Sequence, residues 1–215
     1  MKKIFAFLLT SLLVMSMLCG CGDKAASDQK SQDTQGEKTI SNKDNGTKKT
    51  SSKLSDSKQI GPLSLYIDVP DWRVEDWGYG FVASESADYA IVVITDSEPH
   101  SDETIDDAFP LIYNDKLIGV LMQFYHATYQ DFTPEITERV TIADDVKALK
   151  FDDNAPVNDY GTETTFPVYG YAFSYDDYPI IVLSIITNES NVDDAKRAEI
   201  NGYVDEMVQT IRNKK

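Results

Sequence analysis

Cysteine is almost absent from the sequence. Only two occur, Cys19 and Cys21, and both lie in an apolar segment near the amino end. The rest of the chain therefore has no disulfide framework, no Cys-x-x-Cys redox pair and no cysteine metal site. Histidine is equally scarce. His100 and His126 are too few and too isolated for a histidine-rich metal site or a catalytic relay, and we interpret both as ordinary surface or rim residues.

Positive charge is scarce over most of the chain. Residues 60–215 hold 30 acidic and 10 basic side chains, a net charge of −20, whereas residues 22–59 hold 6 and 8. A surface this anionic repels phosphate, so we exclude nucleic acid as a partner. Motifs for nucleophilic or zinc hydrolysis and for phosphate binding are also missing, such as Gly-x-Ser-x-Gly and His-Glu-x-x-His. We expect no cofactor.

The amino end has the three-part layout of a secretory signal, with Lys2 and Lys3, an apolar run over residues 4–18, and small residues after it. The run is too short for a spanning helix, which needs about 20 apolar residues. Its end, Leu18-Cys19-Gly20-Cys21, resembles a bacterial lipobox. The resemblance implies a signal peptide over residues 1–20 and a diacylglyceryl anchor on Cys21, at the extracytoplasmic face of the cell membrane. The alternative is a plain secretory signal with two incidental cysteines.

The segment after Cys21 is poor in apolar side chains. Residues 22–59 contain mainly Lys, Ser, Asp, Thr, Gln, Gly and Asn. Such a composition buries too little apolar surface to offset the entropy of ordering. We therefore predict that residues 21–59 form a lipidated, disordered tether. A flexible coil of this length has a root-mean-square reach of about 35 Å.

Residues 60–215 show the hydrophobic periodicity of one folded domain. In chain order we expect a hairpin of residues 63–69 and 77–82, a buried strand over 90–95, a helix over 105–128, a hairpin of 136–142 and 146–151, a hairpin of 166–175 and 179–187, and a helix over 193–212. The strand over 90–95 is apolar on both faces, which is typical of the middle of a sheet. Thr104 and Asp107 form a capping pair at the start of the long helix, and Pro110 should begin or kink it.

This order of elements resembles the PsbP/Mog1-like domain, as do the Pro70-Asp71-Trp72 turn and the hairpin that precedes the last helix. The resemblance implies an α+β fold in which an antiparallel β-sheet is sandwiched by helices. It also implies a non-enzymatic docking module, because family members bind photosystem subunits or a Ran-type GTPase and many bacterial members are lipoproteins. No interaction residue of the family can be matched here, and the net charge of −20 over residues 60–215 departs from the family.

Aromatic side chains form the first candidate site. Tyr169, Tyr171 and Tyr175 share one face of a strand by the period of two. Together with Trp72 and Trp77 they are candidates for an exposed platform that binds a ligand or a partner. An aromatic row on one sheet face is more often the core beneath a helix, and we favour that interpretation.

Paired acids form the second candidate site. Residues 152–165 are rich in Asp, Asn, Pro, Gly and Thr, which predicts a long polar loop. In it, Asp152, Asp153 and Asp159 are candidate ligands for a hard cation such as Ca²⁺. They lack the spacing and central glycine of an EF-hand loop. The other acidic pairs fit solvated turns and helix starts.

These patterns together predict a membrane-anchored, extracytoplasmic lipoprotein whose domain is a non-enzymatic binding or assembly module. Its partner would be an unidentified protein or envelope component. The alternative is an envelope hydrolase that uses the carboxylates of residues 152–159, which two close, buried carboxylates with raised pKa values would favour. A solute-binding lipoprotein is less favoured, because one small lobe offers no inter-lobe cleft.

Replacement of the lipid acceptor tests the anchor. Cys21→Ser should release the protein into the medium or leave it unprocessed, because the thiol that forms the thioether is gone. Membrane fractionation with electrophoretic sizing measures this, and Cys19→Ser is the matched control. Correctly processed Cys21→Ser protein that stays fully membrane-bound would contradict lipidation.

Overall fold

The structure is a computed structural model that describes residues 53–121, 127–129 and 132–213. The predicted signal peptide, Cys21, most of the predicted tether and His126 lie outside these residues. All the described residues belong to one compact unit. Its elements are β1 (Leu54–Gln59), β2 (Leu65–Pro70), β3 (Arg73–Asp76), β4 (Gly80–Ser84), β5 (Tyr89–Thr95), α1 (Ile105–Val120), β6 (Ala127–Tyr129), β7 (Ile136–Thr141), η2 (Ala143–Asp145), β8 (Lys147–Asp159), β9 (Thr162–Tyr175), β10 (Tyr178–Ile186), η3 (Glu189–Asn191), α2 (Asp194–Met207) and β11 (Arg212–Asn213).

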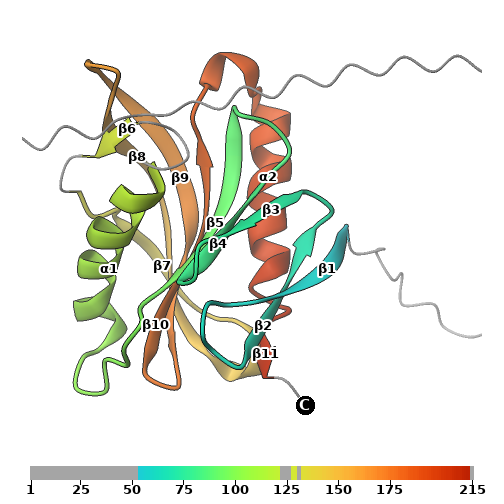
Figure 1. The fold of residues 1–215 in the computed structure, drawn as a ribbon, viewed down its shortest axis with the longest axis vertical. Helices are drawn as coiled ribbons and strands as arrows, with labels where there is room; N and C mark the ends of the chain where they lie inside the picture. The colour runs from blue at the N-terminus through green and yellow to red at the C-terminus, as the bar shows by residue number, and fades with distance from the viewer. Residues whose placement is uncertain (1–52, 122–126, 130–131, 214–215) are drawn as a thin grey trace, which may run out of the picture. The chain divides into compact units, whose positions relative to one another are not determined.

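Two helices cover opposite faces of an eight-stranded antiparallel sheet. The strand order is β3-β4-β5-β10-β9-β8-β6, and β7 pairs with β8. Figure 1 shows α1 on one side of this sheet and α2 on the other. Successive residues of β5 point to the two sides, so Val92 joins the apolar cluster under α1 and Val93 joins the cluster under α2. The expected antiparallel sheet between helices is confirmed.

The centre of the sheet is the pair β5 and β10, as the apolar sequence of both strands predicts. Every residue of β5 is buried, and β10 is buried from Pro179 to Ile186. Each buried Val, Leu or Ile side chain contributes about 1.5–3 kcal/mol relative to an exposed one. The buried hydroxyl groups here are satisfied, since Thr95 donates to the Pro179 carbonyl (3.2 Å) and Ser184 to Asn201 Oδ1 (2.8 Å).

The folded domain begins earlier than predicted. Residues 54–59, which we assigned to the tether, form β1 and pair with β2. Leu54 packs against the α2-side core, and Lys53 Nζ lies 2.9 Å from Glu199 Oε1 on α2. The composition did not predict β1, because the strand is held by its backbone pairing with β2 and only one of its side chains is large and apolar.

The first predicted hairpin is wrong. β2 lies between β1 and β11 in a separate three-stranded sheet, whereas β4 pairs with β3 and β5. Ile67 on β2 packs in the same cluster as Val204 on α2, so the helix stabilises this small sheet. A tight turn follows, in which the Trp72 amide donates to the Pro70 carbonyl (2.7 Å) and the chain passes to the large sheet.

Both helices begin where the sequence predicts and end earlier. At the start of α1, Thr104 Oγ1 donates to Asp107 Oδ2 (2.7 Å), and Pro110 lies inside the helix. At the start of α2, Asp193 accepts from the Lys196 amide (2.7 Å). Residues 127–129 form β6 instead of the end of the long helix, and Arg212 lies in β11. β6 pairs with β8, and β11 pairs with β2, so these segments form strands where the last turns of the helices were predicted.

The predicted loop over 152–165 is also wrong. These residues form the distal halves of β8 and β9, joined by the two-residue turn Tyr160-Gly161. Ala155 and Val157 are fully buried, so the strand continues the alternation of Leu149 and Phe151. The polar composition belongs to the exposed face of the strand.

Two glycines give opposite predictions for stability. A Cβ on Gly170 in β9 would lie 2.3 Å from the Val182 carbonyl oxygen and 2.8 Å from Leu183 Cα. Gly170→Ala should therefore destabilise the fold by about 2–3 kcal/mol. A Cβ on Gly202, inside α2, would meet no atom within 4 Å, so Gly202→Ala should stabilise by about 0.5–1 kcal/mol. Urea unfolding midpoints measure both changes, and equal stability of the two variants would contradict the packing of β9 on β10.

Candidate functional site

Two of the tyrosines nominated from the sequence lie beneath α2. Tyr169 and Tyr171 are 9% and 6% exposed. Both hydroxyl groups donate to Asp205 Oδ1 on α2, at 2.6 Å from Tyr171. The Lys150 ammonium lies 5.1 and 5.5 Å from the two ring centroids. Burial and the hydrogen bond to Asp205 raise the pKa of Tyr169, so its hydroxyl stays a donor.

The exposed aromatic platform is therefore wrong. Tyr175 lies half-buried at the end of β9. Trp72 packs edge-on against Tyr89 (5.6 Å between centroids) and Tyr203 (5.1 Å) on the α2 side, whereas Trp77 packs against the cluster on the α1 side. The five aromatic residues do not form one surface, and most of their area stabilises the core.

The acidic candidates do not converge. Asp152, Asp153 and Asp159 lie along β8, paired with Tyr169, Val168 and Thr162 of β9 respectively. At about 3.3 Å per residue, the first and last of the three are about 23 Å apart along the strand. Within residues 53–121, 127–129 and 132–213, no group of three or more His, Cys, Asp or Glu side chains could hold a metal ion. The structure gives the predicted calcium site no geometric support.

His100 lies in a polar cluster between β5 and α1. Its Nδ1 is 2.9 Å from Glu103 Oε2 and its Nε2 is 3.2 Å from Asp96 Oδ2. Lys116 Nζ lies 3.5 Å from Asp96, and the His100 amide donates to the Asp177 carbonyl (2.8 Å). The hydrogen bond to Glu103 and the neighbouring Asp96 raise the pKa of His100. Only the protonated ring donates from both nitrogens.

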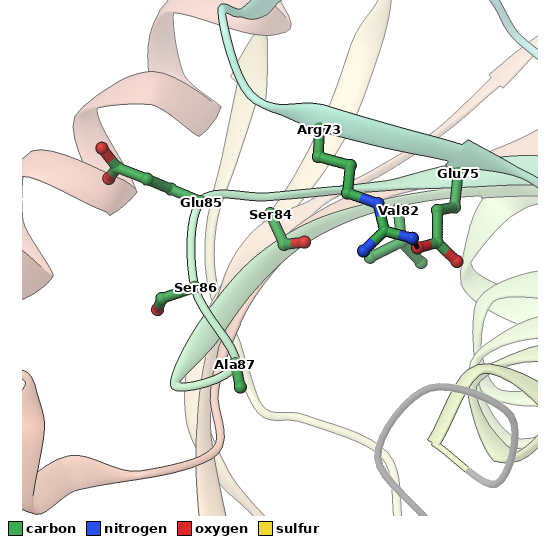
Figure 2. A pocket seen from close by; sticks show the side chains of 7 residues that line it. All are labelled: Arg73, Glu75, Val82, Ser84, Glu85, Ser86 and Ala87. Carbon is green, nitrogen blue, oxygen red and sulfur yellow. Dashed lines mark ion pairs between the residues drawn. The ribbon is translucent and has the colours of Figure 1, made fainter. Parts of the chain in front are cut away.

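A shallow depression of about 390 Å³ lies at the β3 end of the large sheet (Figure 2). Arg73 lies opposite Ser84 and Glu75 opposite Val82 in the β3–β4 pair, so these four side chains share one face. That face is the one that carries α1, because Val82 belongs to the α1-side cluster. Figure 2 shows the Arg73 and Glu75 side chains side by side, and Arg73 Nη2 lies 2.5 Å from Glu75 Oε1.

The rest of the rim comes from the turn between β4 and β5. Ser86 and Ala87 complete the lining, while Glu85 points toward α2, where its carboxylate lies 3.2 Å from Lys196 Nζ. The lining is therefore mixed: one ion pair, two hydroxyl groups and small apolar side chains.

Beside the depression, β3 ends the sheet, with β4 as its neighbour. The Trp77 amide donates to the Gly80 carbonyl (3.1 Å) and closes the β3–β4 turn. Hydrogen-bonded pairs alternate along an antiparallel ladder, so Glu75 and Arg73 bond to β4 while Val74 and Asp76 turn their backbone groups outward. Among the described residues, no backbone hydrogen bond is made to the outer side of Val74.

The sequence patterns did not reveal this edge. Residues 73–76, Arg-Val-Glu-Asp, fell within the turn expected between the two tryptophans. The charge of residues 73–76 could have indicated the edge, because short strands with charged side chains are typical of sheet edges. Neither helix of the described residues is long and apolar enough to span a membrane.

Comparison with known proteins gives limited similarity. No family model matches the chain, and no curated protein matches it. Among solved structures, a protein from Bacteroides thetaiotaomicron is similar at 13% identity and a TM-score of 0.37, over 70% of this chain and 45% of that one. The chain thus spans less than half the length of that protein. The solution structure of cyanobacterial PsbP (CyanoP) from Synechocystis is similar at 12% identity and a TM-score of 0.41, over 70% of this chain and 87% of that one. At these TM-scores neither similarity assigns a role to any residue.

The His100 cluster predicts a pH-dependent stability. The raised pKa means that protonation of His100 stabilises the fold. This stabilisation is complete at pH values below the pKa of an unfolded histidine, about 6.5. This contribution is lost as the pH rises through the higher pKa of the folded state. The difference in unfolding free energy between wild type and His100→Gln should therefore shrink from about pH 6 to about pH 9. Urea unfolding over this range measures it, and a constant difference would show that His100 does not titrate against Glu103 and Asp96.

Proposed function

We propose that the protein is a lipid-anchored, extracytoplasmic lipoprotein whose domain is a non-enzymatic binding module that docks a partner at the β3 edge. Its partners would include the cell membrane, through the lipid anchor on Cys21. The lipobox and the polar segment after it support the anchor. The PsbP/Mog1-like assignment belongs to the same proposal, supported by an antiparallel sheet with a helix on each face.

The observation that carries docking is the open outer side of β3. An extended segment of a partner can add as a further strand, with main-chain hydrogen bonds to Val74 and Asp76. The depression beside β3 would receive a side chain of that segment, next to Arg73 and Ser84. The net charge of −20 over residues 60–215 favours a segment with basic side chains and disfavours a second copy of this chain.

The predicted tether meets the domain on the α2 side, near the turn that precedes β3, since Leu54 pairs with Pro70. β1 lies beside β2, and Lys53 pairs with Glu199 on α2. Neither contact uses a β3 residue, so the outer backbone groups of β3 would stay available to a partner. The shortened tether, from Cys21 to Lys53, has a root-mean-square reach of about 30 Å as a flexible coil.

A proline at the edge tests strand addition. Val74→Pro removes the outward N–H, while the bonds of Arg73 and Glu75 to β4 remain. In affinity capture from membranes of the source cell, with the tethered domain as bait, the amount of captured partner should fall at least about fivefold, because a main-chain hydrogen bond is lost.

Val74→Ala is the matched control, because it removes the same packing against the α2-side core but keeps the amide. A partner retained by wild type and Val74→Ala and lost by Val74→Pro supports the proposal. If the three baits capture the same proteins in equal amounts, the β3 edge is not the docking site.

A further inference from the structure

An open groove lies at the end of the large sheet where the β8–β9 turn meets the end of β10. Its volume is about 490 Å³, which is within the size range of small-ligand sites. Figure 1 shows the β8–β9 turn at the upper left, at the far end of both strands. The groove is lined by the turn itself, the first residues of β9, and the segment that follows β10 through η3. Segments far apart in sequence therefore build it.

The lining carries hydrogen-bonding groups without a cation. Hydroxyl groups come from Thr162, Thr164 and Thr165 on β9, and Phe166 is a buried apolar residue beside them. From the other wall come four residues: Thr187, Asn188, Glu189 and Ser190. No Lys or Arg lines the groove, Asp159 adds negative charge, and the Glu189 carboxylate is paired with Arg197. An anionic ligand is repelled here, and an apolar ligand would leave the polar groups unpaired.

The wall after β10 is held in place. The side-chain amide of Asn188 donates through Nδ2 to Asp88 Oδ1 (2.9 Å), and the Thr187 hydroxyl donates to the Ala87 carbonyl (2.8 Å). Glu189 is oriented by Arg197 Nη2, at 2.9 Å. With their donors engaged within the protein, Asn188 and Thr187 keep oxygen acceptors for a ligand.

Tyr160 stands at the mouth of this groove. It is 79% exposed and occupies the left-handed region at φ +49°, followed by Gly161 at φ +89°. This is a two-residue hairpin turn in which both positions favour Asn, Asp or Gly. A bulky side chain in the left-handed region costs free energy, and such costs are concentrated at functional sites. A tyrosine ring offers a large, stiff apolar face for a ligand.

We propose that this groove binds a neutral oligosaccharide. A sugar ring has an apolar C–H face that stacks on an aromatic ring, and hydroxyl groups that bond to threonine and asparagine side chains. Tyr160 supplies the ring, and the walls supply the hydrogen bonds. The proposal does not depend on strand addition at β3, because the two sites share no lining residue.

Two neutral tetramers with the same β-1,4 linkage test the site. Tetra-N-acetylglucosamine has the acetamido chemistry of a bacterial wall glycan, and cellotetraose has that of a plain glucose polymer from outside the cell. The full chain, purified in a sugar-free detergent, is titrated with each by calorimetry. At least one tetramer should bind with a Kd at or below about 1 mM. The tetramer that binds identifies the source of the ligand, which is either a bacterial wall glycan or a glucose polymer from outside the cell.

Three variants of Tyr160 separate binding from folding. Tyr160→Phe keeps the ring and should keep the Kd within about threefold. Tyr160→Ala and Tyr160→Asn remove the ring and should weaken binding at least about tenfold. Tyr160→Asn should also melt at or above the temperature of wild type, because Asn suits the left-handed turn. Tyr79→Ala removes another exposed ring, 44% exposed, and should leave the Kd unchanged.

Three results would overturn the proposal. The first is that neither tetramer binds. The second is that Tyr160→Asn binds as tightly as wild type, or that Tyr79→Ala weakens binding as much as Tyr160→Ala does. The third is that an anionic tetragalacturonate binds as tightly as the neutral tetramers, since the lining holds the Asp159 carboxylate and no Lys or Arg.

Discussion

The structure depends on burial of the β5–β10 pair on both of its faces. Every residue of β5 is buried, and one face packs under α1 while the other packs under α2, so both helices contribute to the burial of the sheet. Close packing of β9 on β10 extends this constraint, because Leu183 lies directly against Gly170. A centre covered on both sides leaves no room for a ligand. Both proposed sites therefore lie at the margins of the sheet, at the β3 edge and around the β8–β9 turn.

Polar side chains near the core attach the helices to the sheet. Asp205 on α2 accepts from the hydroxyl groups of Tyr169 and Tyr171, and Ser184 of β10 donates to Asn201 on α2. The few cations of the domain are used in the same way, since Lys196 bridges Glu85 and Glu199. The excess acidic groups remain on the surface, where they repel anionic molecules.

The sequence predicted part of the fold and little of the candidate sites. The tyrosine row was placed on the right strand and face, and the favoured interpretation, a row in the core beneath a helix, holds for Tyr169 and Tyr171 under α2. The loop over 152–165 failed because composition was weighed above periodicity: Phe151, Ala155 and Val157 alternate as a strand should. Tyr160 was overlooked because its importance lies in a backbone angle, φ +49°, that no side-chain pattern encodes.

Local sequence by itself determined the buried strands, the two helix starts with their Thr104 and Asp193 caps, and the overall excess of negative charge. These features depend on residues within a few positions of one another. Only the tertiary structure decided that residues 54–59 and 212–213 flank β2, that β3 is left open, and that the segment after β10 faces the β8–β9 turn. The backbone hydrogen bonds that join strands are nearly the same for every residue type and so leave no mark in the composition. The choice of partner depends on side chains that pack together from distant parts of the chain.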